Sequence, residues 1–407
     1  MKKYLLFISM VLTISLLVSA QSTADIYCKK GGEKIALQDY QGAMKDLNKA
    51  IESNGKHAEA YSKRGFTKYK LHDFQGAMID LNTAIEINPK LAVAYFNRGV
   101  LKSEMADQVG AVNDYNKALE LDASLSEAFY NRGVIKWDQK DYQGATKDFT
   151  KAIELNTKYT EAYYYRGLTK SKLLDYQGAI KDYTKAIELN PKLIDAYTNR
   201  GIAKNNTQDF QGAIADLTRA TELDPYQKEA YYNRGISKHH LLDYDGAITN
   251  FNKAIELDMY HADAYFFRGK SKKELADFEG ALADYNKSLQ IKPGNTEVYF
   301  CSGIVKTALK DYQNALIDFD AFIQANPKES NAFATRAQTK ELLADYQGAL
   351  KDYDKVVELT PKEGKAYFNR GNVKYKLQMQ KNACTDWSKA GELGYMEAYE
   401  QIKSNCK

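Results

Sequence analysis

The residues best suited to chemistry in this 407-residue sequence are five histidines and four cysteines. Three of the histidines, His239, His240 and His261, occur within one short stretch beside Asp263. Such a group could bind a metal ion or respond to pH. Adjacent histidines point to different faces of a helix, however, and the sequence has no HExxH, CxxC or GxSxG motif and no phosphate-binding glycine loop. We therefore predict no catalytic site, no metal site and no cofactor, so the protein is not expected to be an enzyme.

A second group of residues is better suited to binding. Asparagines stand two positions before regularly spaced glycines, at Asn97, Asn131, Asn199, Asn233 and Asn369. One position earlier runs an aromatic row: Phe96, Tyr130, Tyr164, Tyr232, Phe266, Phe300 and Phe368. An asparagine amide both donates and accepts hydrogen bonds, so these amides could bind a peptide backbone in a groove lined by the aromatic rings. The alternative is that both sets pack neighbouring helices together, and the sequence leaves the two interpretations open.

The spacing of these residues follows a 34-residue repeat. Glycines recur in one frame from Gly31 to Gly371, with Ala337 in the single gap, and alanines recur in a second frame from Ala43 to Ala383. All six prolines share a third frame. A repeat of this length is typical of a solenoid, in which each unit buries its apolar face against its neighbours.

One unit, Thr160–Leu193, shows how each repeat is expected to fold. Apolar and small residues recur every three to four positions in both halves, which predicts two helices. Asp175 separates the halves and is placed to cap the second helix, and Pro191 ends that helix. Gly167 and Ala179 have almost no side chain, so the two helices can approach closely. The unit is therefore predicted to be a hairpin of two short antiparallel helices.

This pattern resembles the tetratricopeptide repeat. The aromatic, Gly, Ala, aromatic, Ala and Pro positions of that family correspond to Tyr163, Gly167, Ala179, Tyr183, Ala186 and Pro191. The resemblance implies an all-α, right-handed superhelical solenoid over residues 21–397, followed by a capping helix over 398–407. Eleven units are expected, starting near residues 24, 58, 92, 126, 160, 194, 228, 262, 296, 330 and 364.

Three charged columns repeat with the same period. A lysine occurs in all eleven units, an arginine four residues before it in nine, and an aspartate on the second helix in ten. Ser302 replaces the arginine in the ninth unit, and Asn250 replaces the aspartate in the seventh. We expect each aspartate to neutralise an arginine or lysine across helices, each exposed bridge contributing ~0.2–1 kcal/mol. The alternative is that the columns form a binding surface.

The N-terminus resembles a secretory signal peptide. Residues 1–20 contain two lysines, then an apolar run, then small residues suited to a cleavage site. This pattern predicts cleavage before Gln21. The alternative is an uncleaved membrane anchor, but the run is short for ~30 Å of hydrocarbon. No second long apolar run follows. We therefore expect an exported protein, periplasmic or secreted, that is soluble and not inserted in the membrane after cleavage.

The last unit differs from the others. Residues 383–406 contain Trp387 at the aromatic position and resemble half of a Sel1-like repeat, which is expected to cap the solenoid. Cys28 and Cys301 are too far apart along a solenoid to form a disulfide. Cys384 and Cys406 are close enough to pair in an oxidising compartment. The alternative is that these two remain free thiols near a mobile terminus.

The net charge and the composition limit the classes of function that the protein could have. The formal net charge is +4, or +2 once Lys2 and Lys3 leave with residues 1–20, and acidic and basic residues are interspersed. The sequence has no unmatched basic stripe, so we expect no nucleic-acid partner. The function that fits best is a non-enzymatic scaffold in a bacterial envelope that binds other proteins or peptide segments in its groove. The alternative is an envelope assembly or secretion cofactor, or a holdase-type chaperone with many clients.

Overall fold

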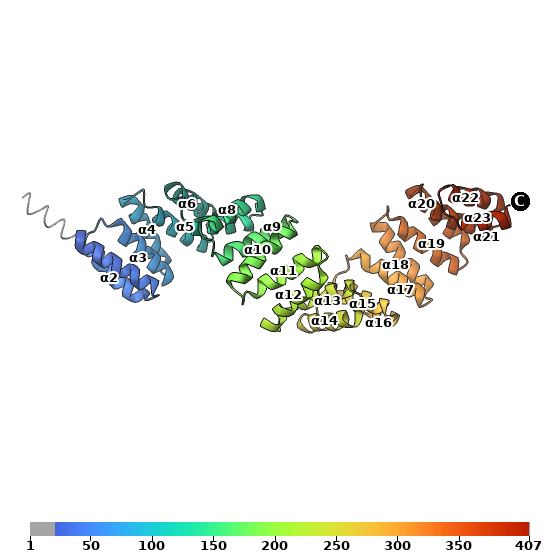
Figure 1. The fold of residues 1–407 in the computed structure, drawn as a ribbon, viewed down its shortest axis with the longest axis horizontal. Coiled ribbons are helices and arrows are strands. Elements are labelled where there is room, and N and C mark those ends of the chain that lie inside the picture. The colour runs from blue at the N-terminus through green and yellow to red at the C-terminus, as the bar shows by residue number, and fades with distance from the viewer. Residues whose placement is uncertain (1–20, 407) are drawn as a thin grey trace, which may run out of the picture. The chain divides into compact units, whose positions relative to one another are not determined.

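A computed structural model of the chain describes residues 21–406 (Figure 1). Residues 1–20, where the sequence predicts a signal peptide, and residue 407 lie outside this range. All regular secondary structure in the described range is helical. A helix over residues 21–36 comes first. It is followed by α2 (Tyr40–Ser53), α3 (Ala58–Lys70), α4 (Phe74–Ile87), α5 (Ala92–Glu104), α6 (Gln108–Leu121), α7 (Ser126–Asp138), α8 (Tyr142–Leu155), α9 (Thr160–Lys172), α10 (Tyr176–Leu189), α11 (Ile194–Asn206), α12 (Phe210–Leu223), α13 (Lys228–His240), α14 (Tyr244–Leu257), α15 (Ala262–Glu274), α16 (Phe278–Ile291), α17 (Thr296–Ala308), α18 (Tyr312–Ala325), α19 (Ser330–Leu342), α20 (Tyr346–Leu359), α21 (Gly364–Lys376), α22 (Gln380–Glu392) and α23 (Ala398–Asn405).

Each repeat is a helical hairpin, and the fifth repeat, α9 with α10, is representative. Leu174 in the turn has a φ of +63°, in the left-handed region. This conformation reverses the chain within three residues. The Asp175 carboxylate then accepts a hydrogen bond of 2.9 Å from the backbone N–H of Gly178, which caps α10 as predicted. The same left-handed turn and aspartate cap recur in most of the other hairpins.

A close approach between the two helices forms the core of each repeat. Tyr183 on α10 is fully buried and lies directly against Gly167 on α9. A Cβ atom added at Gly167 would stand 2.7 Å from Cε1 of Tyr183, so no larger residue fits without displacing the ring. Ala179 and Ala186 on either side are also fully buried. The small and large residues of the repeat pattern therefore interlock as the sequence predicts.

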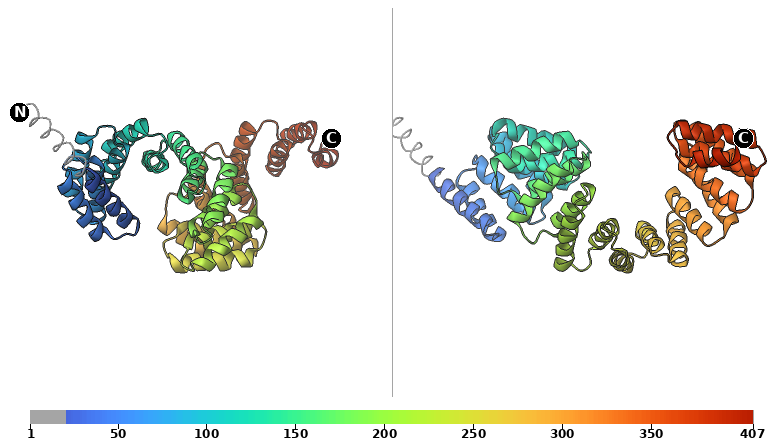
Figure 2. Two further views of the ribbon diagram at one scale, coloured as in Figure 1. Left: turned by 60° about the vertical axis from the view of Figure 1, so that its left-hand side comes forward. Right: turned by 45° about the vertical axis from the view of Figure 1, so that its right-hand side comes forward.

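The chain divides into two compact units, with the boundary between Ala203 and Lys204. Within each unit, the second helix of one hairpin packs against the first helix of the next, as α8 does on α9 and α12 does on α13 (Figure 2). This succession confirms the predicted all-α solenoid. Among residues 21–406, no helix is long and apolar enough to cross a membrane.

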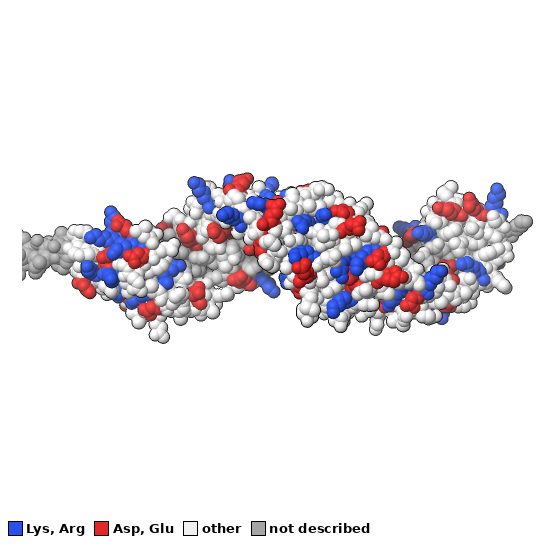
Figure 3. Space-filling view, turned by 90° about the horizontal axis from the view of Figure 1, so that it is seen from below, with Lys and Arg blue, Asp and Glu red and all other residues white. Residues whose placement is uncertain are grey.

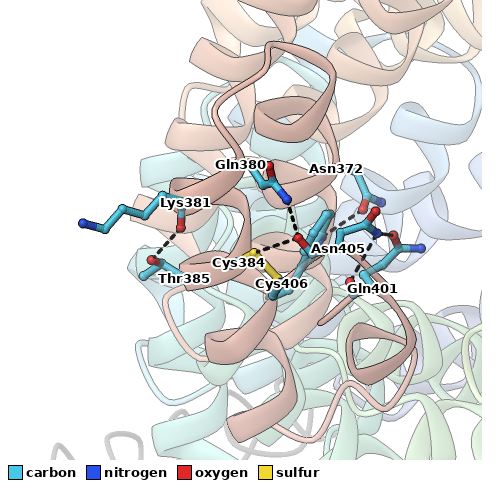
Figure 4. The surroundings of a disulfide bond; sticks show 9 residues. Asn372, Gln380, Lys381, Cys384, Thr385, Gln401, Asn405 and Cys406 are labelled. Carbon is cyan, nitrogen blue, oxygen red and sulfur yellow. Dashed lines mark hydrogen bonds between the residues drawn. A yellow bond between two sulfur atoms is a disulfide. The ribbon is translucent and has the colours of Figure 1, made fainter. Parts of the chain in front are cut away.

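The last repeat is closed by α23 and a disulfide. Cys384 on α22 is bonded to Cys406 after α23, 22 residues later (Figure 4). Ala398 of α23 is fully buried in a cluster with Trp387. In the chain-entropy model, a loop of this length stabilises the native state by ~3 kcal/mol. The other two cysteines, Cys28 and Cys301, are free.

Candidate functional site

The predicted aromatic row is largely used in packing. The Tyr164 ring lies 6.0 Å from the buried Tyr183 ring of its own repeat, centroid to centroid. The equivalent contacts are Phe96–Tyr115, Tyr130–Phe149, Tyr232–Phe251, Phe266–Tyr285 and Phe300–Phe319. Phe368 instead contacts Tyr395 beside the terminal helix, with ring centroids 4.9 Å apart and planes tilted by 43°. These rings support the core of each hairpin, and most of them remain partly exposed on one face.

Three of the five predicted asparagines, Asn97, Asn199 and Asn233, use their amide N–H groups within the chain. Asn199 donates to the Tyr164 hydroxyl at 3.2 Å and to the Asp195 carbonyl at 2.8 Å. Asn233 donates to the Glu229 carbonyl at 2.8 Å, and Asn97 donates to the Ser62 hydroxyl at 3.3 Å. All five asparagines are partly exposed. Their carbonyl oxygens therefore retain the capacity to accept from a ligand backbone, and their role in binding stays a prediction.

A hollow of about 620 Å³ gathers several of these side chains in the second compact unit. It is lined by Asn205, Asn206, Gln208, Phe210, Tyr232, Asn233, Ile236, His240 and Phe267. Of the predicted groove residues, only Tyr232 and Asn233 line it. The His240 ring is stacked on the Phe210 ring, with centroids 4.7 Å apart and planes 7° from parallel. No Asp, Glu, Lys or Arg contributes to the lining, so this hollow presents amides and aromatic faces.

Sequence reasoning missed most of this hollow. Asn205 and Phe210 come from the end of α11 and the start of α12, outside the asparagine and aromatic rows. Asn205 donates to the Asn233 carbonyl at 3.0 Å and accepts from the Ser237 hydroxyl at 2.6 Å, which ties α11 to α13. The one available signal was the histidine group, since His240 lines the hollow.

The three grouped histidines have separate roles. His239 Nδ1 lies 3.0 Å from the Ser271 hydroxyl, and burial, together with Lys270 and His240, lowers the pKa of His239 to about 4. His261 accepts a hydrogen bond from the Ala264 backbone N–H and so caps α15. Over residues 21–406, no group of His, Cys, Asp and Glu side chains is arranged to hold a metal ion.

Two further hollows involve first helices of other repeats. One of about 440 Å³ near the N-terminus is lined by charged residues that include Asp25, Lys29, Glu59 and Lys63. The other, of about 150 Å³, includes Asn369 together with Asn331 and Thr335. The chemistry of the first-helix face therefore changes along the chain, and the 620 Å³ hollow is the uncharged one of these three.

The charged columns form one repeating cluster, which we call the charge cluster: the Arg, Lys and Asp of a single repeat. In the fifth repeat, Arg166 donates to both carboxylate oxygens of Asp182, at 2.9 and 2.6 Å. Lys170 Nζ lies 2.8 Å from the same carboxylate. Arg166 also donates to Thr150 of the preceding repeat at 3.2 Å. The predicted pairing is confirmed, and the arginine additionally joins consecutive repeats.

The expectation that these bridges are exposed is wrong. The Asp182 side chain is only 5% exposed, because the stems of Arg166 and Lys170 cover it. A buried carboxylate left without partners is far more costly than a broken surface pair. The same bidentate pairs join Arg64–Asp80, Arg98–Asp114, Arg132–Asp148, Arg268–Asp284, Arg336–Asp352 and Arg370–Asp386.

Comparison with known proteins identifies the repeats. Models of the tetratricopeptide repeat match residues 24–57, 126–159 and 262–295, residues 160–193, and residues 198–262. No curated protein matches the chain. The chain therefore carries tetratricopeptide repeats, as the sequence pattern predicts.

Several solved structures resemble parts or most of the chain. YrrB, described as a TPR protein with an unusual peptide-binding site, is 29% identical, with 45% of this chain and 95% of that chain covered and a TM-score of 0.44. MamA is 27% identical, with 44% and 96% covered and a TM-score of 0.39. Yeast Tom70 is 18% identical, with 94% and 96% covered and a TM-score of 0.37. Because these TM-scores are below 0.5, the assignment rests on the family models and on the helix pairs themselves.

Proposed function

We propose that this protein is a non-enzymatic scaffold that binds segments of other polypeptides on the face formed by its first helices. The observation that carries the proposal is the uncharged 620 Å³ hollow, lined by amides and aromatic rings. Amides match the donors and acceptors of a peptide backbone, and flat aromatic faces bind apolar side chains at little entropic cost. Asn233, Tyr232 and the stacked pair of His240 and Phe210 would form the centre of this site.

The location we propose is outside the cytoplasm, in a bacterial envelope. The features that support it are the signal-like residues 1–20 and the disulfide between Cys384 and Cys406, since disulfides persist mainly in oxidising compartments. After cleavage before Gln21, the protein would not be inserted in the membrane. In this proposal, the Sel1-like segment 383–406 closes the end of the repeats.

The surface charge supports a protein partner and no nucleic acid. On the face drawn in Figure 3, lysines and arginines are intermixed with aspartates and glutamates and form no continuous basic stripe. Nucleic-acid binding requires such a stripe, because the phosphate backbone dominates the affinity.

Site-specific crosslinking tests the binding face. A photo-crosslinking amino acid at position 240, which lines the hollow, should form adducts with the bound segment. The matched control is position 181, an exposed residue on α10 of the fifth repeat, which should form few. Equal labelling from both positions would rule out the proposed face. A scaffold should give few partners at fixed ratios, whereas many partners would favour the holdase alternative.

An asparagine substitution tests the chemistry of the hollow. Asn233→Ala removes one hydrogen-bond acceptor from the hollow. It should lower the affinity for a captured segment by about 2- to 12-fold, equivalent to ~0.5–1.5 kcal/mol for one neutral hydrogen bond. Asn131→Ala, at the same register position but outside this hollow, is the matched control. Affinities measured by titration with the crosslinked segment should separate the two variants. If both bind like the wild type, the asparagine row has a packing role only.

A further inference from the structure

The seventh repeat contains an arginine without a carboxylate partner. Asn250 replaces the aspartate, and its Oδ1 accepts from Arg234 Nε at 2.6 Å. Arg234 Nη1 donates to the hydroxyls of Thr218 and Thr221, each at 3.1 Å. In complete charge clusters, Nη2 binds the second carboxylate oxygen. Within the described residues, Arg234 Nη2 has no hydrogen-bond partner.

In the part of the chain that the structure describes, no neighbouring carboxylate forms an ion pair with Arg234. Lys238, which would bind the missing aspartate, instead pairs with Asp243 at 2.9 Å. The nearby carboxylate of Glu222 pairs with Arg219 at 2.9 Å, and that of Glu256 pairs with Lys253 at 2.6 Å. The Arg234 guanidinium therefore remains without an ion-pair partner of its own in this repeat.

Burial makes that charge unfavourable in the free protein. It lowers the pKa of the Arg234 guanidinium from its ordinary value, against the opposing influence of Tyr231 and Glu222. The Asp80 carboxylate has the reverse effect on Arg64, where a direct hydrogen bond raises the pKa. Arg234 still carries its charge at neutral pH, because an arginine is not deprotonated in proteins.

A hollow of about 360 Å³ opens beside the guanidinium. Its lining is Tyr231, Arg234, Thr249, Asn250, Asn252, Lys253 and Glu256, from α13 and α14. The Arg234 guanidinium lies 5.2 Å from the centroid of the Tyr231 ring, which helps to hold it in place. A volume of this size corresponds to several water molecules at ~30 Å³ each, enough for a carboxylate or a phosphate group.

We propose that this hollow is an oxyanion-binding site, in which Arg234 is the principal donor and Lys253, whose partner Glu256 lines the same hollow, adds a second ammonium donor when it turns from Glu256 to the ligand. The oxyanion is a carboxylate or a phosphate, because a guanidinium binds the planar or tetrahedral oxygens of either group with paired hydrogen bonds. The site lies between the two helices of one hairpin and shares no lining residue with the uncharged hollow, so it does not depend on the proposed function.

Ligand-dependent melting of the full chain tests the site. Inorganic phosphate and N-acetyl-glutamate amide, each titrated at constant ionic strength with chloride as the balance, should raise the melting midpoint saturably by about 1–3 °C. Asn250→Asp supplies an internal carboxylate to Arg234, so this variant should lose the response. The probe that saturates at the lower concentration identifies whether the natural group is a carboxylate or a phosphate.

A second variant separates the site from general stability. Asp182→Asn recreates the arrangement of the seventh repeat around Arg166, so in the Asn250→Asp background, which has lost the response, it should restore a saturable one. Lys253→Gln should raise the phosphate concentration needed for half-saturation by at least threefold. An identical response to phosphate and to N-acetyl-glutamate amide in the wild type and in Asn250→Asp would overturn the proposal.

Discussion

The fifth and seventh repeats have the same fold and different charge clusters. Both bury a large aromatic against a glycine, Tyr183 against Gly167 and Phe251 against Gly235. They differ at the carboxylate, which is Asp182 in the fifth repeat and Asn250 in the seventh. The hairpin therefore forms without a complete cluster. The interlocked core specifies the repeat, and the charges can vary without changing it.

The ninth repeat shows the opposite replacement. Ser302 stands where the arginine is expected and is 1% exposed, while Lys306 still lies 2.7 Å from the Asp318 carboxylate. The helices of this repeat nevertheless form a hairpin of ordinary length, α17 with α18. The hairpin therefore forms with one cationic partner for the aspartate, although Asp318 Oδ2 is buried and, apart from this ion pair, has no hydrogen-bond partner within the described residues. In contrast, Arg234 in the seventh repeat has no negative partner.

Reversing the carboxylate of the fifth repeat should have the largest effect. Asp182→Lys would place a third positive charge between Arg166 and Lys170 in a buried position, and should cost about 3–5 kcal/mol. Because a solenoid unfolds partly by repeats, both the denaturant midpoint and hydrogen exchange in residues 160–193 should be measured.

The seventh repeat supplies the comparison for this change. Asn250→Lys should cost less, since that repeat already lacks the carboxylate. Glu188→Lys is a surface control, because Glu188 is 56% exposed in its pair with Lys185, and it should leave the midpoint nearly unchanged. Equal losses for Asp182→Lys and Glu188→Lys would contradict the buried role of the cluster.

A pH-dependent effect of intermediate size should distinguish the seventh repeat. The pKa of His239 is lowered to about 4 by burial, against an ordinary value of 6.5. The unfolded chain therefore binds the proton first, so stability present above pH 6.5 is lost as the pH falls towards 4. We expect the hydrogen-exchange protection of residues 228–261 to be about tenfold lower at pH 4 than at pH 7. This is less than the full shift in the His239 pKa would give, because His239 is only half-buried and solvent screens its charge.

The fifth repeat is the control for the range between pH 7 and pH 4, since Ser171 stands there at the position of His239. Protection factors for residues 160–193 should change less between pH 7 and 4. His239→Gln should remove most of the difference between the two repeats. If the variant keeps the same pH profile as the wild type, His239 does not destabilise this repeat on acidification.

The smallest effect should come from the turns, in which the two repeats agree. Leu174 and Leu242 have φ values of +63° and +62° and are 72% and 70% exposed. Glycine adopts this conformation without the steric cost that leucine has. Leu174→Gly and Leu242→Gly should each stabilise the protein by ~0.5–1 kcal/mol in thermal or denaturant unfolding, and by similar amounts. A destabilisation in either would show that the exposed leucine makes a contact that matters.

The sequence by itself determined the fold. A 34-residue repeat of small, aromatic and capping residues can satisfy its helix ends and bury its apolar faces only by stacking hairpins. For the same reason the register predicted the Asp175 cap, the close approach at Gly167 and an arginine or lysine partner for each aspartate, whereas the structure decided that Arg166 and Lys170 both bind Asp182. The Cys384–Cys406 pair likewise follows from the short distance between a last hairpin and the helix that covers it.

Only the tertiary structure decided which side chains meet in the 620 Å³ hollow. The asparagine and aromatic rows are periodic, but the 620 Å³ hollow is not, because it also takes residues from the end of α11 and the start of α12. The burial of Asp182 could not be predicted from the sequence either, since it depends on how the arginine and lysine side chains cover the carboxylate. A one-residue change, such as Asn250 for Asp, alters little in the repeat pattern. Its consequence becomes visible only when the structure shows Arg234 half-buried beside a hollow and without an ion-pair partner.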